Sequence, residues 1–512
     1  MNNTVFKISI FIFLIISLTL IILHNIFGIS ISFLAEEEIK ENRTLKVDLI
    51  DSISINNTET IYDKMNNIYY YTITDKYENN NYVLKLNLDN GYKYKILNTS
   101  LNIIKIDYSK PIDIIIYNEK YYYETKIQLT NLPLINITTP STIGSTDVNS
   151  SFTYINSENI NKIITTNSEI HVRGATAKNF DKKSYKLNFC NDSCTKDNNI
   201  IISDFYYGSA FILDAVYRDP SKIRNVLSIN LWNLISKDFT ELNIDSEFVE
   251  LFINNEYKGL YVFTETVNRR NLNLNKEDDI NYGVVLKANS WNKLSNTMNF
   301  KDLSLNNFYE YELKYPNDED YHKDVWNQLI NKLGTFYDNY YKITDKLIEE
   351  TFDINNYIDL IIFNAFINNS DNNFIKNNYF YYNNIENFKI NIQPWDMEYS
   401  FGLNYSSENE MATLKNLSDY NLIYTSFYHD EAKNLNELII KRYWNLRKNI
   451  LTKEYFDNIL NNYKNELSKG SALRDSNIWY EYDIDLEIED IRTWIYNRLD
   501  YFDEYVRSLE NE

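Results

Sequence analysis

Short apolar and polar runs alternate along residues 44–130, and this pattern predicts β-strands. The clearest runs are residues 69–73, 82–88 and 112–117. Short strands separated by polar turns are typical of a small β-sandwich. The tripeptide Asp89-Asn90-Gly91 lies between two runs and predicts a hairpin turn. We expect this region to be a spacer, or a module that contacts carbohydrate or protein.

A second group of strands is expected after residues 132–151, because this stretch is rich in Thr, Ser and Asn and indicates a domain boundary. The first strand of the group ends in a loop of small residues that begins at Gly174. A hairpin is expected to turn at Asn254-Asn255, since apolar residues alternate on both sides of it. The predicted strands and hairpin cover residues 169–173, 183–189, 248–264 and 284–287.

From residue 324 onward the apolar residues recur every three or four positions, which predicts amphipathic helices. These helices are expected over residues 326–341, 354–366, 435–463 and 488–509. An earlier helix is expected over residues 221–236, with Ser221 as its N-cap. A β-rich first part followed by a helical second part predicts the α+β class.

The N-terminus carries a targeting signal. Residues 8–23 are almost wholly apolar, Lys7 precedes them, and Glu36 is the next charged residue. The run is longer than a usual signal-peptide core and is followed by no clear cleavage site, which favours a single-pass membrane anchor over a cleaved signal peptide. In either case the body of the protein is expected to be secreted, or to lie on the lumenal or extracellular side of the membrane.

Cysteine usage agrees with such a compartment. Cys190 and Cys194 are the only cysteines, and they are close enough to form a disulfide under oxidising conditions. A tetrahedral metal site is not predicted, since the chain has only four histidines. Glycosylation is permitted, though not required, at sequons that begin at Asn42, Asn56, Asn98, Asn136, Asn149, Asn191, Asn404 and Asn416.

The chain is strongly acidic, with a net charge of -21 and an isoelectric point of about 4.8. This charge argues against a nucleic-acid partner, because phosphate contacts require clustered Lys and Arg. An acidic surface suits a basic substrate, but it also simply keeps a secreted protein soluble. With 512 residues, the chain is long enough for two or three domains.

The residues with the clearest chemical potential lie in residues 368–402. Asp371 and Asp396 stand on either side of an aromatic run, residues 379–382, that predicts a strand. Two carboxylates beside Asn-rich loops suit phosphoryl transfer, in which one takes the hydroxyl proton and the other, helped by an Asn, holds magnesium. The alternative is structural, since Asp and Asn are also common turn formers.

Five segments together resemble the CotH family, the spore-coat-type atypical protein kinases. Residues 371–377 and 394–402 resemble its D-N-x-x-x-K-N loop and its P-W-D-x-x-x-x-F-G segment. Residues 172–189 resemble its R-G-x-S/T and K-K-S-Y-K signature, and residues 224–228 its R-N-x-L-S helix start. Residues 251–265 resemble its F-I-N-G-x-Y-x-G-L-Y-x-x-x-E hairpin. The resemblance extends from about residue 132 to the C-terminus.

The resemblance implies a kinase-like two-lobed body, with a β-rich N-lobe over about residues 160–320 and a helical C-lobe over about residues 321–512. The implied domains are a signal anchor or signal peptide (1–35), the β-rich accessory domain (36–130) and the CotH-like kinase domain (131–512).

The same resemblance implies a protein kinase that transfers the γ-phosphate of ATP to Ser or Thr hydroxyls of a protein substrate, with Mg²⁺ or Mn²⁺. Asp371 would be the catalytic base, and Asp396 would bind the metal with help from Asn377 or Asn378. The residues that would bind the nucleotide are Lys183, Glu265, Arg173 and Lys287. Strand alternation places Lys182 and Lys186 on the opposite face from Lys183, and which face points inward stays open.

Two other classes of function stay open. In ordinary protein kinases the metal-binding Asn lies about five residues after the catalytic Asp, whereas Lys376 occupies that position here. Fungal relatives of the family include surface adhesins. A cell-surface adhesin on a kinase-like scaffold with little or no catalysis is therefore an alternative, as is a structural coat or wall component.

Overall fold

The computed structural model describes residues 34–46, 53–73, 81–88, 91–99, 102–156, 163–174, 176–202, 207–238, 244–277, 280–298, 307–340, 342–369, 376–403 and 431–510. The chain forms two compact units. Unit 1 comprises Met1–Ser209, Phe248–Tyr261 and Asn465–Glu481, and unit 2 comprises Ala210–Glu247, Val262–Lys464 and Tyr482–Glu512. Sheets and helices both contribute, so the predicted α+β class is confirmed, while the two-lobed arrangement stays a prediction.

The first part of unit 1 is β-rich, as predicted, and begins with helix α2 (Glu36–Glu41). Its main sheet has six strands, of which the central one is parallel to two partners and antiparallel to a third. In spatial order these strands are β4 (Ile61–Asp63), β5 (Ile68–Thr72), β11 (Tyr121–Thr130), β10 (Ile112–Tyr117) and β8 (Lys93–Ile96), with β1 (Thr44–Leu45) also paired to β11.

Two smaller sheets share a core with the main sheet. Tyr71, Ile116 and Leu129 from the six-stranded sheet pack in one buried cluster with Ile55 and Leu84. The smaller sheets consist of β3 (Thr58–Glu59), β2 (Ser54–Ile55) and β7 (Leu86–Asn87), and of β6 (Asn81–Val83) and β9 (Ile103–Lys105).

The predicted hairpin around Asp89-Asn90-Gly91 is wrong. Strand β7 before it pairs with β2, and strand β8 after it pairs with β10, so the two flanking strands do not pair with each other. Leu86 and Tyr94 enter the same core from different sheets, and this packing outweighs the local turn preference.

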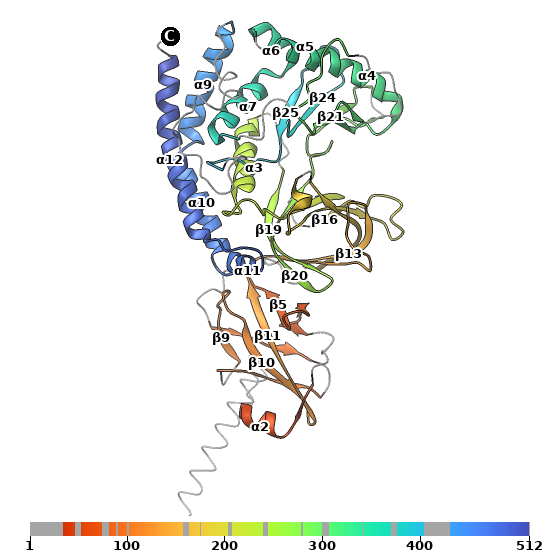
Figure 1. Ribbon diagram of the computed structural model, residues 1–512, viewed down its shortest axis with the longest axis vertical. Helices are drawn as coiled ribbons and strands as arrows, with labels where there is room; N and C mark the ends of the chain where they lie inside the picture. Colours follow the sequence, from red (N-terminus) through yellow and green to blue (C-terminus); the bar gives the residue numbers. More distant parts are fainter. Residues whose placement is uncertain are drawn as a thin grey trace, which may run out of the picture. The chain divides into compact units, whose positions relative to one another are not determined.

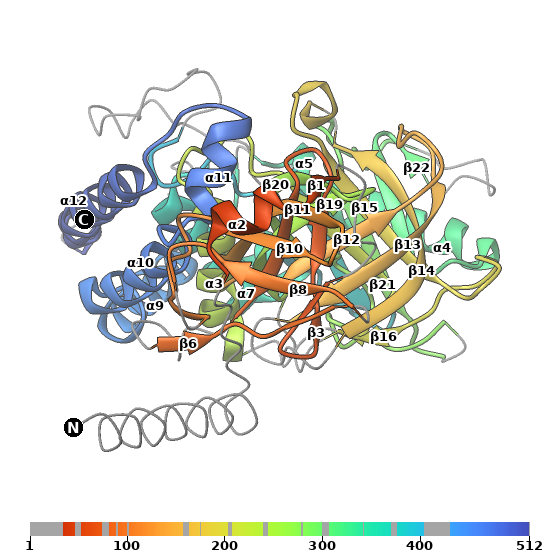
Figure 2. The same ribbon diagram turned by 90° about the horizontal axis from the view of Figure 1, so that it is seen from below.

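The second β-rich region closes into a barrel, which the sequence did not predict. The predicted strands and the turn at Asn254-Asn255 are confirmed, and both Asn residues have positive φ, 53° and 60°. The curved strands β13 and β14 lie side by side (Figure 2). The barrel order is β12 (Leu134–Thr138), β13 (Val148–Ile155), β14 (Ile163–Arg173), β15 (Ser184–Cys190), β18 (Ala210–Asp214), β20 (Glu256–Glu265) and β19 (Ser246–Ile253).

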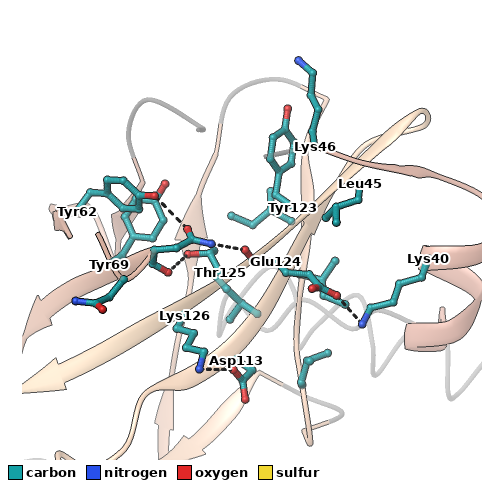
Figure 3. A pocket seen from close by; sticks show the side chains of 16 residues that line it. Lys40, Leu45, Lys46, Tyr62, Tyr69, Asp113, Tyr123, Glu124, Thr125 and Lys126 are labelled. Carbon is teal, nitrogen blue, oxygen red and sulfur yellow. Dashed lines mark hydrogen bonds and ion pairs between the residues drawn. The ribbon is translucent and has the colours of Figure 1, made fainter. Parts of the chain in front are cut away.

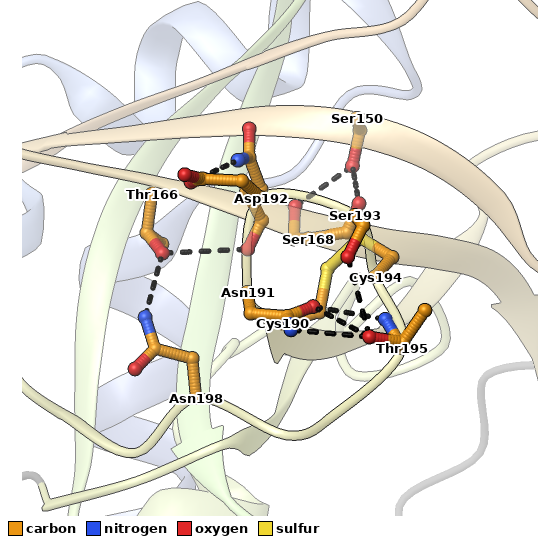
Figure 4. The surroundings of a disulfide bond; sticks show 11 residues. Ser150, Thr166, Ser168, Cys190, Asn191, Asp192, Ser193, Cys194, Thr195 and Asn198 are labelled. Atoms are coloured by element: carbon orange, nitrogen blue, oxygen red, sulfur yellow. Dashed lines mark hydrogen bonds between the residues drawn. A yellow bond between two sulfur atoms is a disulfide. The ribbon is translucent and has the colours of Figure 1, made fainter.

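The predicted disulfide joins Cys190 and Cys194 directly after β15, with their Cα atoms 4.8 Å apart. A local hydrogen bond stabilises the loop between them, because the Asn191 side chain accepts the N–H of Thr195, the residue after Cys194, at 2.9 Å (Figure 4). Three short elements lie near the barrel strands in sequence: 3-10 helix η2 (Ala177–Asn179), β16 (Ile200–Ile201) and β17 (Tyr207–Gly208).

Unit 2 contains a five-stranded sheet that ends in the hairpin β24–β25. The predicted strands at residues 284–287 and 379–382 are confirmed as parts of neighbouring strands. In spatial order the strands are β22 (Asn307–Phe308), β23 (Tyr311–Tyr315), β21 (Gly283–Ala288), β24 (Asn378–Asn383) and β25 (Asn391–Pro394).

Helices occupy the regions that the apolar spacing predicted, but the helix expected over residues 326–341 is divided among three helical elements, and helices over residues 345–351 and 471–478 were not predicted. The long helices α9 and α12 lie side by side (Figure 1). Helix α7 is buried along almost its whole length, and the Asp353 side chain caps its N-terminus. The helices are α3 (Arg224–Ile235), α4 (Glu319–Leu329), α5 (Thr335–Asp338), α6 (Asp345–Thr351), α7 (Ile354–Ile367), α9 (Lys433–Asn449), α10 (Lys453–Leu467), α11 (Ser471–Ile478) and α12 (Ile484–Leu509), with π-helix η4 (Ile330–Gly334) and 3-10 helix η3 (Ser236–Asp238).

The single helix predicted over residues 435–463 is wrong in one detail, since the structure divides it into α9 and α10. Helix α9 ends at Asn449, and the Thr452 hydroxyl accepts a hydrogen bond from the Tyr455 N–H at 3.1 Å. A Thr that caps a new first turn begins a second helix, although the apolar periodicity continues across the break.

Within the part of the chain that the structure describes, no helix is long and apolar enough to span a membrane. The apolar run of residues 8–23 lies outside the described residues.

Candidate active site

Three chain segments leave one edge of the unit 2 sheet next to one another. Ala288 of β21 pairs with Asn378 of β24, which pairs with Pro394 of β25. Neighbouring strands lie about 4.8 Å apart, so the residues next to this row stay close together. Asn377, Asn378 and Asp396 are therefore gathered at this edge.

Two residues at this edge have a left-handed backbone conformation. Asn377 and Asp396 both have a φ of 58°, in the left-handed region that Asn and Asp tolerate better than most residues. The Asn377 N–H donates to the Ala288 carbonyl at 3.2 Å, and the Asn377 carbonyl accepts from the Trp395 N–H at 2.9 Å. Asp396 is exposed, whereas Asn377 is buried.

Lys287 lies on β21, one residue before the row. It pairs with Tyr379 on one side and with Glu312 on the other, and its ammonium lies 5.7 Å from the centre of the Tyr379 ring. Burial would raise the pKa of Glu312, but Lys314 and, more weakly, Lys287 lower it below its ordinary value. Lys287 thus brings positive charge to the sheet close to Asn378.

Asp371, the predicted catalytic base, lies outside the described residues, in residues 370–375. Helix α7 ends shortly before this segment, and its C-cap Asn368 has a φ of 52°. Lys376 and Asn377 follow the segment.

Glu398, two residues after Asp396, was not predicted. Its Oε1 atom is buried and has no hydrogen-bond partner among the described residues. Burial raises its pKa well above the ordinary value, and the carboxylates of Asp214, Asp219 and Asp396 raise it further, while Lys222 opposes them. The four acids of this cluster therefore outnumber its two cations, Lys222 and the arginine that pairs with Asp219, Arg224.

Asn225 of α3 ties this cluster together. Its amide nitrogen donates to Asp214 at 3.3 Å, and its amide oxygen accepts the Met397 N–H at 3.1 Å. Because Met397 lies between Asp396 and Glu398, this contact fixes the backbone that carries both acids.

The start of α3 differs from the prediction. The helix begins at Arg224 with Ile223 as N-cap, so the prediction of Ser221 as N-cap is wrong. Asp219 takes over the capping, because its carboxylate accepts the Arg224 N–H at 2.9 Å and pairs with the Arg224 guanidinium at 2.5 Å. A carboxylate that also binds a buried guanidinium is a stronger partner here than the Ser221 hydroxyl.

Arg173 and Lys183 belong to unit 1. Arg173 is the last residue of β14 and pairs with Ser184. The Lys183 ammonium donates to the carbonyls of Lys178 and Phe180, so it secures the loop that follows Gly174. The structure places these two predicted nucleotide-binding residues around one loop.

Of the three lysines whose direction the sequence left open, Lys182 is the buried one, and it lies before β15, so strand alternation does not govern it. It is buried, and its ammonium contacts the Asp475 carboxylate at 2.6 Å and the Leu260 carbonyl at 2.5 Å. Gly259 makes this approach possible, because a Cβ at this position would collide with the Asp475 carboxylate.

Glu265 is the last residue of β20 and pairs with Phe211. Its N–H donates to the Asp245 carbonyl at 3.3 Å, and it is buried rather than solvated.

Sequence signals for the unpredicted residues exist but are weak. Glu398 alternates with Asp396 in Asp-Met-Glu, and Asp219 lies five residues before Arg224. Asp475 could not have been found, since only the fold brings it to Lys182 across 293 positions of sequence.

A divalent cation fits these residues. Magnesium takes oxygen ligands, and proteins usually bind it through one or two carboxylates together with substrate phosphates. Asp396 and Glu398 supply two carboxylates, and the buried Glu398 oxygen is suited to a cation. In the described residues no three acidic, His or Cys side chains are close enough together to hold a metal ion.

Residues 170–502 match the model of a family described as CotH kinase protein. No curated protein matches the chain. Since the family match covers well over half of the chain, the chain belongs to the CotH kinase family, and the resemblance predicted from its motifs is confirmed.

Proposed function

We propose that this member of the CotH kinase family is a protein kinase that transfers the γ-phosphate of ATP to Ser or Thr hydroxyls with Mg²⁺ or Mn²⁺. The observation that carries the proposal is the meeting of Asn377, Asn378 and Asp396 at one sheet edge, with the buried Oε1 atom of Glu398 two residues after Asp396 in the chain. Phosphoryl transfer depends on positioning and on offsetting charge, and this edge can do both.

Each residue has a role in the proposal. Asp396 and Glu398 would hold the divalent cation, with Asn377 or Asn378 assisting. The cation, when bound, would offset the negative charge of the phosphates. Asp371 would accept the proton of the substrate hydroxyl. Its segment, residues 370–375, directly precedes Lys376 and Asn377 in the chain.

Four of the predicted residues would hold the nucleotide. Lys183 and Arg173 would orient the phosphates from the loop after β14, and Glu265 and Lys287 would complete the set. The proposal includes the two-lobed body, a lumenal, extracellular or secreted location, and a membrane anchor or signal peptide at residues 1–35.

A second candidate function, a surface adhesin or coat component, is favoured by one observation. A cavity of about 480 Å³ opens on the six-stranded sheet of unit 1 (Figure 3). Its lining mixes aromatic, amide and charged groups, including Tyr62, Asn67, Glu124 and Lys126. A binding protein could use this cavity without any phosphoryl transfer.

Incorporation of labelled phosphate from ATP, with magnesium or manganese, tests the proposal in the full-length chain. The kinase requires incorporation that disappears in Asp396→Ala. If the native protein incorporates none and ATP leaves its thermal stability unchanged, the adhesin becomes the better conclusion.

A further inference from the structure

Next to the candidate active site, β22 and β23 are joined by a two-residue turn, Tyr309-Glu310. Phe308 pairs directly with Tyr311 across it, and both turn residues have positive φ, 53° and 65°, which is the type I′ conformation. Such a turn normally consists of Asn-Gly, because a side chain other than Asn or Asp is strained there. Tyr and Glu therefore weaken the turn, and strain of this kind is concentrated at functional sites.

Both side chains face solvent rather than the core. Tyr309 is 49% exposed, and Phe308, its neighbour, packs against Trp326 instead. Among the described residues, the Glu310 side chain accepts one hydrogen bond, from the Asn292 amide at 2.9 Å through Oε2. The structure of the turn itself thus gives no reason for these two residue types.

Tyr309 and Glu310 line an open cavity of about 470 Å³ together with Asn289 and Ser290. The lining offers an aromatic ring, a carboxylate and neutral polar groups, and none of its described residues is a cation. An aromatic face attracts Lys and Arg, and the carboxylate pairs with their charged ends. A basic side chain fits this cavity better than a phosphate, which Glu310 would repel.

The register places the cavity at the same sheet edge as the candidate active site. Tyr311 pairs with Ala288, Ala288 with Asn378, and Asn378 with Pro394, while the Asn289 N–H donates to the Glu310 carbonyl at 3.1 Å. Three strand spacings separate the turn from Asp396, roughly 14 Å. An extended peptide covers that distance in about four residues.

We propose that the cavity lined by Asn289, Ser290, Tyr309 and Glu310 docks a Lys or Arg side chain of the protein substrate, about four residues from the hydroxyl that receives the phosphate. This inference rests on the proposed function. It defines the substrate as a basic segment, and the net charge of -21 would favour the approach of such a segment.

The probes are short fluorescent peptides with one serine and a single arginine that is moved one position at a time. Phosphorylation by the full-length chain is expected to be fastest when about four residues separate the arginine from the serine. Glu310→Gln should raise KM for that peptide about threefold with kcat little changed, because an exposed charge pair contributes modestly. Glu386→Gln is the matched control, since Glu386 is an exposed acid in the β24–β25 turn of the same sheet.

Two further variants separate docking from folding. Tyr309→Asn places a preferred residue in the turn, so it should leave thermal stability equal or higher while it weakens peptide affinity. Glu310→Lys should reverse the preference, so that a peptide with glutamate in place of arginine becomes the better substrate. Unchanged selectivity in both variants would overturn the proposal, as would displacement of the peptide by ATP.

Binding measured without ATP distinguishes this proposal from the proposed function. Fluorescence anisotropy with a peptide in which alanine replaces the serine reports docking alone. Arginine-dependent binding that Glu310→Gln weakens supports docking even if no phosphate is transferred. Phosphate transfer without arginine dependence would leave the kinase standing and overturn the docking site.

Discussion

Two buried sites, one in each unit, differ in how their charges are balanced. In unit 1, Lys182 is paired with Asp475, and Arg474 with Glu250, and all four groups are buried or nearly so. In unit 2, Glu398 lies among other carboxylates with one buried oxygen that has no partner in the described residues. Balanced charge fixes a structure, whereas unbalanced charge indicates a ligand of opposite sign. The predictions below test that distinction.

Asp396→Ala should have the largest effect. If Asp396 holds the metal, its loss should reduce phosphate incorporation by at least roughly a thousandfold, about 4 kcal/mol of transition-state stabilisation. Its side chain is exposed, so the thermal midpoint should hardly change. Normal incorporation by the variant would remove Asp396 from the metal site.

Asp475→Ala should instead reduce stability. It leaves the Lys182 ammonium buried without its carboxylate, which costs about 3 kcal/mol or more of unfolding free energy. Denaturant unfolding measures this loss. As a control, Glu350→Gln breaks an exposed pair with Lys346 and should change stability by less than about 0.5 kcal/mol. Equal effects of the two changes would contradict the structural role of the Lys182 pair.

Glu398→Gln should show the reverse of Asp475→Ala. Without ligand the variant should be as stable as the native protein, since it removes a charge that its surroundings disfavour. Magnesium with ATP, at ten times its dissociation constant, should stabilise the native protein by about 1.4 kcal/mol and the variant by less. Thermal shifts measure both quantities, and equal shifts would exclude Glu398 as a ligand.

Asp245→Asn should give the smallest effect, through pH. Burial raises the pKa of Asp245 from its ordinary value of 3.8 to about 6. The folded state then holds this proton longer than the unfolded state, so its contribution to stability is full below pH 3.8 and is lost as pH rises to about 6. Because Asp245 is partly exposed, the loss should be at most about 1 kcal/mol. Unfolding at a series of pH values should show this decline only in the native protein.

Much of the fold was predictable because local patterns control it. The hairpin at Asn254-Asn255 follows from residues that accept positive φ, and helix α7 from an unbroken apolar run. The division between α9 and α10 was missed because apolar spacing continues through the break, while Thr452 caps the second helix. The barrel was missed because closure depends on pairing between distant strands, to which periodicity is insensitive.

The candidate site was predicted only where motifs are contiguous. Asn377, Asn378 and Asp396 lie within one hairpin, so sequence proximity indicated that they meet. Lys182 and Glu398 could not be assigned, because the role of each depends on groups supplied by distant segments, such as Asp475 and Asp214.

The place of α11 in the chain also has a consequence for biosynthesis. Unit 1 includes Asn465–Glu481, so the partners of Lys182 and Glu250 are made 293 and 224 residues after them. During translation at roughly 5–20 residues per second, the barrel strands emerge long before Arg474 and Asp475. If the barrel closes before they are made, Lys182 and Glu250 lack the balancing charges of the finished fold, so a chaperone that delays closure would raise the yield of native protein.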